Sequence, residues 1–149
     1  MRLHKSKITA KSELDTANPL ILHGMAFVAD GSYQEGLTVL DQAIHLQQNN
    51  GATWYHRGDA LANLGRYDEA LESFDRSLAI NPDSSDGWVF RGVVLIHLER
   101  YFEALESYDR AIMLQTSNRE AWTFRGVALQ RLGQHKKAYA SYRKATNTR

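Results

Sequence analysis

The side chains in this sequence that could bind a metal ion or act in acid–base chemistry are spread along its 149 residues without a catalytic pattern. No two of the six histidines lie four residues apart, the spacing that would place both on one helix face around a metal ion. The P-loop, HExxH and G-x-S-x-G patterns are also missing. There is no cysteine, which excludes disulfides and thiolate metal sites. We therefore predict no catalytic, metal-binding or cofactor-binding residues, and no enzymatic activity.

The charged residues with a regular spacing are three arginines and three aspartates. The step along the sequence from Arg57 to Arg91 equals the step from Arg91 to Arg125, and Asp41, Asp75 and Asp109 repeat with the same step. Each aspartate precedes its arginine by the same number of residues. The planar guanidinium group suits bidentate contact with a carboxylate. We therefore predict three ion pairs between neighbouring repeats: Asp41–Arg57, Asp75–Arg91 and Asp109–Arg125. The alternative is that these are ordinary surface charges on a repeated template.

The same step relates many other positions, and a fixed period in the range of about 20–50 residues is typical of stacked repeats. Within each repeat, apolar residues at spacings of three and four form two helical stripes, and in the second repeat Gly65 separates them. A residue suited to cap a helix precedes the first stripe in all four repeats: Thr16, Asn50, Ser84 and Asn118. Each repeat is thus predicted to be a pair of antiparallel helices, with three aromatic residues in the core by their spacing: Trp54, Trp88 and Trp122.

The period divides the chain into four repeats, at residues 17–50, 51–84, 85–118 and 119–149. Residues 1–16 match no repeat and are expected to form a flexible tail or a short helix on the first repeat. In the last repeat, Tyr139, Arg143 and Thr146 replace residues that are Leu71, Asp75 and Leu78 in the second. A more polar outer face is typical of a terminal repeat, so we expect the array to end there.

The pattern Trp54-x2-Arg57-Gly58, followed by Gly65-x-Tyr67-x2-Ala70-x3-Phe74, resembles the tetratricopeptide repeat, and it recurs in the third and fourth repeats. The resemblance implies an all-α fold, a right-handed superhelix of four helix-turn-helix hairpins. It also implies a non-catalytic scaffold that holds a peptide or an amphipathic helix of another protein in a concave groove lined by the first helices.

The resemblance further implies which residues line that groove. The candidate contacts at the groove positions of each first helix are Ile21, Met25, Tyr55, Asp59, Ala62, Asn63, Val89, Val93, Ile96, His97, Thr123, Val127, Gln130 and Arg131. The other groove positions hold Asn18, Val28, Ala29, Ala52, Asp86 and Glu120. The lysine and asparagine pattern with which some family members bind a C-terminal carboxylate is missing, so binding of that kind is not expected.

Six apolar groove residues would form a large exposed strip: Ile21, Met25, Val28, Val89, Val93 and Ile96. Monomers rarely leave such a patch uncovered. A partner helix or apolar peptide, the N-terminal tail or a second copy of the chain would then occupy the groove. The alternative is that the curvature of the array buries these side chains.

The charge distribution leaves two other functions open. The net charge of +1 does not favour binding to nucleic acids or membranes, and no apolar run is long enough for a membrane span. Without a signal sequence the expected location is the cytoplasm. However, residues 119–149 carry a net charge of +7 and the first three repeats are acidic. The chain could therefore self-associate through its oppositely charged ends, as a homo-oligomer, or bind RNA through the basic last repeat.

Overall fold

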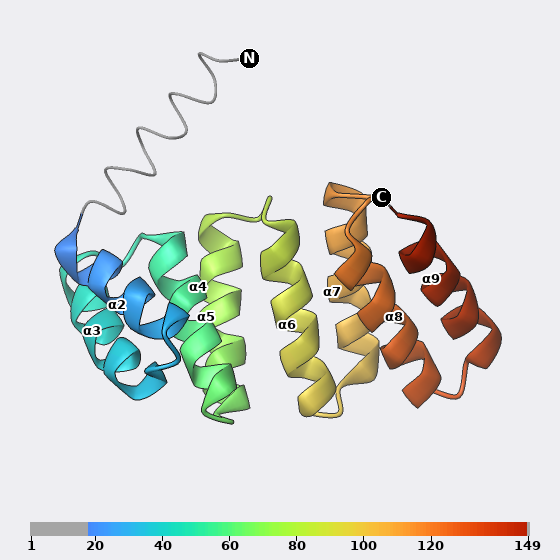
Figure 1. Ribbon diagram of the computed structural model, residues 1–149, viewed down its shortest axis with the longest axis horizontal. Helices are drawn as coiled ribbons and strands as arrows, with labels where there is room; N and C mark the ends of the chain where they lie inside the picture. Colours follow the sequence, from blue (N-terminus) through green and yellow to red (C-terminus); the bar gives the residue numbers. More distant parts are fainter. Residues whose placement is uncertain (1–17, 149) are drawn as a thin grey trace, which may run out of the picture.

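The computed structural model describes residues 18–148, and eight α-helices follow one another in this range. They are α2 (Pro19–Ala29), α3 (Tyr33–Leu46), α4 (Gly51–Asn63), α5 (Tyr67–Ile80), α6 (Ser85–His97), α7 (Tyr101–Leu114), α8 (Arg119–Arg131) and α9 (His135–Asn147). Figure 1 shows them as one row, from α2 and α3 at one end to α9 at the other. The prediction of an all-α solenoid is confirmed. Residues 1–16, expected to form a tail, lie outside the described range.

The helices pack in pairs, and each pair packs on the next. Within the pairs, α2 contacts α3, α4 contacts α5, α6 contacts α7 and α8 contacts α9. Between the pairs, α3 packs on α4, α5 on α6 and α7 on α8. The first helices of neighbouring pairs also touch, since α4 contacts both α2 and α6, and α6 contacts α8. None of the helices in the described range is long and apolar enough to span a bilayer.

Three of the four predicted helix caps are present. The side chains of Asn50, Ser84 and Asn118 each accept a hydrogen bond from the backbone N–H three residues later. The prediction that Thr16 caps the first helix is wrong, because α2 begins at Pro19 and the side chain of Asn18 accepts from the N–H of Leu20. Proline favours the first helical position, where its missing N–H has no intrahelical partner to lose.

Three of the four turns within the helix pairs use glycine in the left-handed region, with φ of 84° at Gly31, 75° at Gly65 and 77° at Gly133. Glu99 occupies this position in the third pair with φ of 59°. Two backbone hydrogen bonds close its turn, from the N–H groups of Glu99 and Arg100 to carbonyls of α6. The turn therefore keeps its shape although its residue has a Cβ that disfavours it.

Replacing Glu99 with glycine should stabilise the protein. A left-handed conformation costs a residue with a Cβ about 1–2 kcal/mol, and the greater freedom of glycine in the unfolded chain offsets part of the gain. Urea unfolding followed by circular dichroism should show a net increase of about 0.5–1 kcal/mol in the free energy of unfolding. The matched variant Gly65→Ala should be less stable than the wild type. A destabilised Glu99→Gly variant would contradict this account of the turn.

The two helices of the third pair approach closely where Gly92 faces the ring of Tyr108. A Cβ on Gly92 would lie 2.5 Å from Cε1 of Tyr108, whose side chain is fully buried. The equivalent contact in the fourth pair joins Gly126 to Tyr142, and in the second pair Gly58 to Phe74. In the first pair a Cβ on Gly24 would lie 2.6 Å from Cδ2 of Leu40, so the close approach recurs in all four pairs.

Gly92→Ala should destabilise the protein by about 1–3 kcal/mol, because the buried ring must move to admit the methyl group. This cost exceeds the gain of about 0.8–1 kcal/mol from the better helix propensity of alanine. The control is Gly51→Ala, where a Cβ meets its nearest neighbours at an ordinary 3.5 Å. Equal free energies of unfolding for Gly92→Ala and the wild type would show that the ring can move without strain.

Candidate functional site

Each arginine of the regular set lies against the aspartate that the sequence pairs with it. Nε of the arginine is 2.7 Å from Oδ1 of the aspartate in Asp41–Arg57, 2.6 Å in Asp75–Arg91 and 2.8 Å in Asp109–Arg125. Every pair joins a second helix to the first helix of the next repeat. The contact differs from the expected bidentate one, because only one nitrogen of each guanidinium group bonds the carboxylate.

A second hydrogen bond of each guanidinium group goes to a serine. Nη1 of the arginine donates to the hydroxyl of Ser73, Ser107 or Ser141, at 2.7–2.8 Å. The three serines are buried and belong to the second helix of the arginine's own repeat. Each arginine thus bridges two successive second helices. Sequence reasoning missed the serines, although they recur with the same step as the arginines and Val39 replaces them in the repeat that lacks the arginine.

The repeated tryptophans are half-buried, so the prediction that Trp54, Trp88 and Trp122 are core residues holds in part: Trp88 packs against the hydrophobic core, but none of the three is fully enclosed in it. Their indole N–H groups donate to backbone carbonyls of the preceding inter-repeat loop, at 2.8–2.9 Å. The bridging arginine of the same helix lies over each ring, 5.7–6.0 Å from its centroid. The tryptophans therefore hold the junction between repeats and support the arginines there.

The structure places the predicted groove residues in three classes. Ile21 and Val89 are 0% and 1% exposed, so predicting them as partner contacts is wrong. Contacts of α2 with α4, and of α6 with α4 and α8, cover this side of the first helices. Most of the other groove residues are half-buried: Met25, Tyr55, Asp59, Ala62, Val93, Ile96, Thr123 and Val127. The exposed ones lie near the carboxyl ends of the first helices: Asn63, His97, Gln130 and Arg131.

The expected apolar strip is therefore not a large exposed surface. Ile21, Val28 and Val89 are buried, while the other three members are half-buried. In the described residues, the large apolar side chains with high exposure lie outside the groove positions: Leu22, Leu46, Leu64, Ile80, Phe102, Met113, Leu114 and Tyr139. The curvature of the array buries half of the strip and leaves the concave side more polar than its sequence predicts.

Tyr55 is a half-buried groove residue on which carboxylates from three successive repeats act electrostatically. Burial and the charges of Asp86, Asp59 and Glu120, in that order, raise the pKa of the Tyr55 phenol. Its ring meets Phe74 and Phe90 edge-on, with centroids 5.9 and 5.6 Å apart. The phenol thus keeps its proton at neutral pH, in a field that disfavours negative charge.

Asp59 carries its charge in a partly desolvated place. Burial raises the pKa of Asp59, while His56 and a 2.8 Å hydrogen bond from the Asn63 amide lower it. Burial in turn lowers the pKa of His56, and the charge of Asp59 opposes that shift. Because the imidazole tends to be neutral, Asp59 has no fixed positive partner there and can attract a cation from outside the chain.

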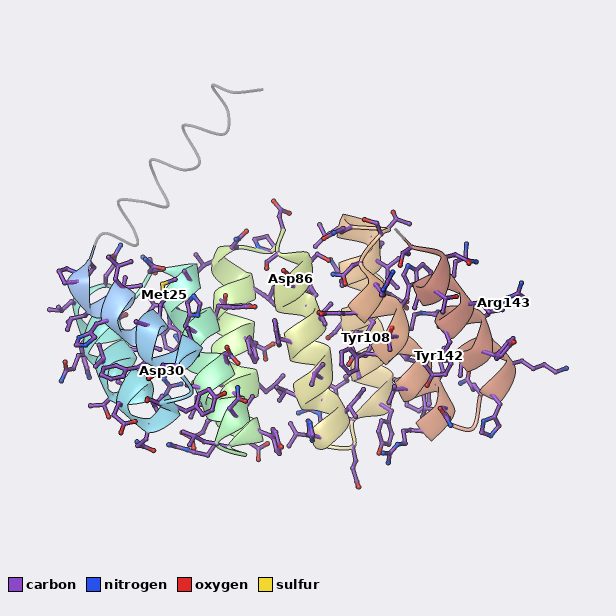
Figure 2. All side chains as sticks on the ribbon, viewed as in Figure 1. Met25, Asp30, Asp86, Tyr108, Tyr142 and Arg143 are labelled. Carbon is purple, nitrogen blue, oxygen red and sulfur yellow. The ribbon has the colours of Figure 1, made fainter. Side chains whose placement is uncertain are left out.

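Two predicted groove residues, His97 and Gln130, contact other side chains of the chain itself. The ring of His97 stacks on Tyr67, with centroids 4.5 Å apart. The amide oxygen of Gln130 accepts a hydrogen bond of 2.9 Å from the phenol of Tyr142. At the equivalent place in the third repeat, Ile96 replaces the glutamine, and the buried phenol of Tyr108 has no hydrogen-bond partner among the described residues. Figure 2 shows both tyrosines in neighbouring repeats.

Metal binding finds no support in residues 18–148, because no group of three or more histidines and carboxylates gathers there in a way that could hold an ion. What the concave side offers is a phenol that donates a hydrogen bond, nearby carboxylates and half-buried apolar side chains.

Two comparisons with known proteins describe the same architecture. Tetratricopeptide repeat models match residues 21–85 and 120–149. A crystal structure of MamA has a TM-score of 0.85 at 20% sequence identity, and the match covers 95% of this chain and 83% of that one. MamA from residue 41 to its end, from Desulfovibrio magneticus RS-1, has a TM-score of 0.84 at 24% identity, over 93% of this chain and 78% of that one. At these identities the likeness extends to the fold. No curated protein matches the sequence.

The Asp75–Arg91 bridge should be worth more than an ordinary surface ion pair. The arginine side chain is only 19% exposed, whereas the aspartate is 49% exposed. A double-mutant cycle with Asp75→Ala and Arg91→Met should give a coupling energy of about 1–2 kcal/mol by urea unfolding. The control cycle removes the exposed pair Arg66–Glu69, whose coupling should be about 0–1 kcal/mol. Equal coupling in the two cycles would mean that the bridge adds no more than a surface contact.

Proposed function

We propose that this chain, which belongs to the tetratricopeptide repeat family, is a non-catalytic scaffold that holds a positively charged peptide segment of another protein on its concave side. The observation that carries the proposal is that Asp59, Asp86 and Glu120, from first helices of successive repeats, carry charges that act on the half-buried phenol of Tyr55. The three carboxylates come from α4, α6 and α8, so an extended segment running along the array would meet them in succession.

The charge balance of this surface supports a cationic partner. The groove positions of the second and third repeats contain no lysine or arginine. The arginines that α4 and α6 do contain, Arg57 and Arg91, are held by the aspartates and serines of the inter-repeat bridges. Lysine or arginine side chains of a partner would therefore find the carboxylates of α4 and α6 without competing lysine or arginine, whereas an acidic peptide would be repelled.

Hydrogen bonding and apolar contact would add to the charge. The Tyr55 phenol keeps its proton and can donate to a backbone carbonyl of the bound segment. Val93 and Ile96 are half-buried and can contact the aliphatic part of a lysine or arginine side chain. Binding through exposed charges weakens as salt screens them, so the complex should be reversible and sensitive to ionic strength.

Neutralising the three carboxylates should weaken binding of a cationic peptide. The variant is Asp59→Asn, Asp86→Asn and Glu120→Gln, and the probe is a fluorescein-labelled lysine-rich peptide followed by fluorescence anisotropy at low salt. Loss of three attractive charges should raise Kd at least about tenfold, which corresponds to about 1.4 kcal/mol. Protonation of Asp59 should also weaken binding in mildly acidic buffer, because burial raises its pKa.

The control variant removes the same number of charges from exposed positions outside the groove: Glu72→Gln, Asp83→Asn and Glu106→Gln. It should bind the peptide with nearly the wild-type Kd. If both triple variants lose affinity equally, the peptide responds only to net charge and the proposed groove is wrong. Affinity capture with the wild type and the groove variant then identifies natural partners as the proteins that only the wild type retains.

A further inference from the structure

The outer face of α2 is an uncovered copy of a surface that is buried elsewhere in the array. Leu22 is 49% exposed, and Pro19 and Ala26 are also exposed. The residues equivalent to Pro19 and Ala26 are buried in all three later repeats: Thr53, Gly87 and Ala121 for the first, and Ala60, Val94 and Ala128 for the second. This face of α2 has the composition of an interior junction but no helix against it among the described residues.

The interior junctions show what kind of element covers such a face. At each junction the second helix of one repeat packs on the first helix of the next, as α3 on α4, α5 on α6 and α7 on α8. The contact is close, since a Cβ on Gly87 would lie 3.0 Å from Cδ2 of Leu78. The complement of the α2 face is therefore the outer face of a second helix.

The second helix that lacks this contact is α9. Tyr139 on α9 is 66% exposed, whereas the equivalent residues Leu37 and Leu71 are 3% and 8% exposed. Tyr139 is also the largest apolar side chain on this helix with high exposure. The two uncovered faces lie at opposite ends of the row of helices (Figure 1), so one chain cannot bring them together.

The charges at the two ends are opposite. In the first repeat, residues 17–50 contain three acidic residues and no lysine or arginine. Helix α9 contains Lys136, Lys137, Arg143 and Lys144 and no acidic residue. Figure 2 shows Arg143 directed outward at the end of the array opposite to Asp30.

We propose that copies of this chain stack head to tail, with α9 of one copy packed on α2 of the next as a second helix packs on a first helix inside the array. Thr146, the equivalent of Leu78, then faces Pro19, the equivalent of Gly87, and Tyr139 covers Leu22 and Ala26. In this register Arg143 meets His23, which stands where the later repeats have arginine, so the junction does not oppose two arginines. The contact lies at the ends, so it goes beyond the proposed function and leaves the concave side open.

A contact between different faces of identical chains leaves one unpaired face at each end of a dimer, so further copies can add. Stacking therefore extends the solenoid and places several concave grooves in one continuous row. Partners with more than one cationic segment would bind such a row more tightly than a single copy.

The test uses full-length wild type and two variants, Leu22→Lys on the α2 face and Tyr139→Asp on the α9 face. Both side chains are exposed within one copy, so both variants should fold, which circular dichroism and thermal melting check. In sedimentation velocity between about 1 and 100 µM, the wild type should form species of increasing size, and less so at high salt. Each variant alone should associate at least about tenfold more weakly, because Leu22→Lys adds a cation facing the basic α9 and Tyr139→Asp adds a carboxylate facing the acidic first repeat.

Mixing the two variants gives the decisive result. The Leu22→Lys chain keeps an intact α9 face and the Tyr139→Asp chain keeps an intact α2 face, so an equimolar mixture should form one-to-one dimers and nothing larger. A wild type that stays monomeric at the highest concentration overturns the proposal. If the chain with Leu3, Ile8 and Leu14 changed to Asp then associates, residues 1–17 cover the α2 face instead. Association that survives both end variants, or a mixture without dimers, also overturns it.

Discussion

Each helix pair in this array has two faces that must be buried against a neighbouring pair, because one pair cannot bury them by itself. Interior junctions solve this by packing the second helix of one repeat on the first helix of the next. The bridging arginines lie at these junctions, joined to an aspartate of the preceding repeat and a serine of their own. The tryptophans hold the adjoining loops there. Covering of one repeat by the next is therefore the constraint from which both the curvature and the uncovered ends of the array follow.

The same constraint decides what the concave side can bind. Close contact between neighbouring first helices buries Ile21 and Val89, which removes apolar area from the concave side. What remains accessible around Tyr55 is a set of carboxylates held at the groove positions. The sequence predicts an apolar groove, but packing buries part of its apolar side chains. The side chains that remain accessible at the groove positions suit a cationic partner.

Much of the fold could be predicted from the sequence because it depends on spacings that recur. The caps at Asn50, Ser84 and Asn118 and the helix pairs follow from local patterns that return in each repeat. The exposure of groove residues could not be predicted in this way, because it depends on how far each first helix turns against its neighbours. The partial burial of the tryptophans could not be predicted for the same reason. Ser107, by contrast, could have been found, since its spacing follows that of Arg91.

The most direct test of the account is a nuclear magnetic resonance titration of the ¹⁵N-labelled chain with a lysine-rich peptide. If a cationic segment lies on the concave side, the amide shifts that change most will belong to α4, α6 and α8 around Tyr55, Asp86 and Glu120. The second helices, which carry most of the other acidic residues, should change little. Shift changes that concentrate on α5 and α7, or that spread evenly over all exposed acidic residues, would contradict the account.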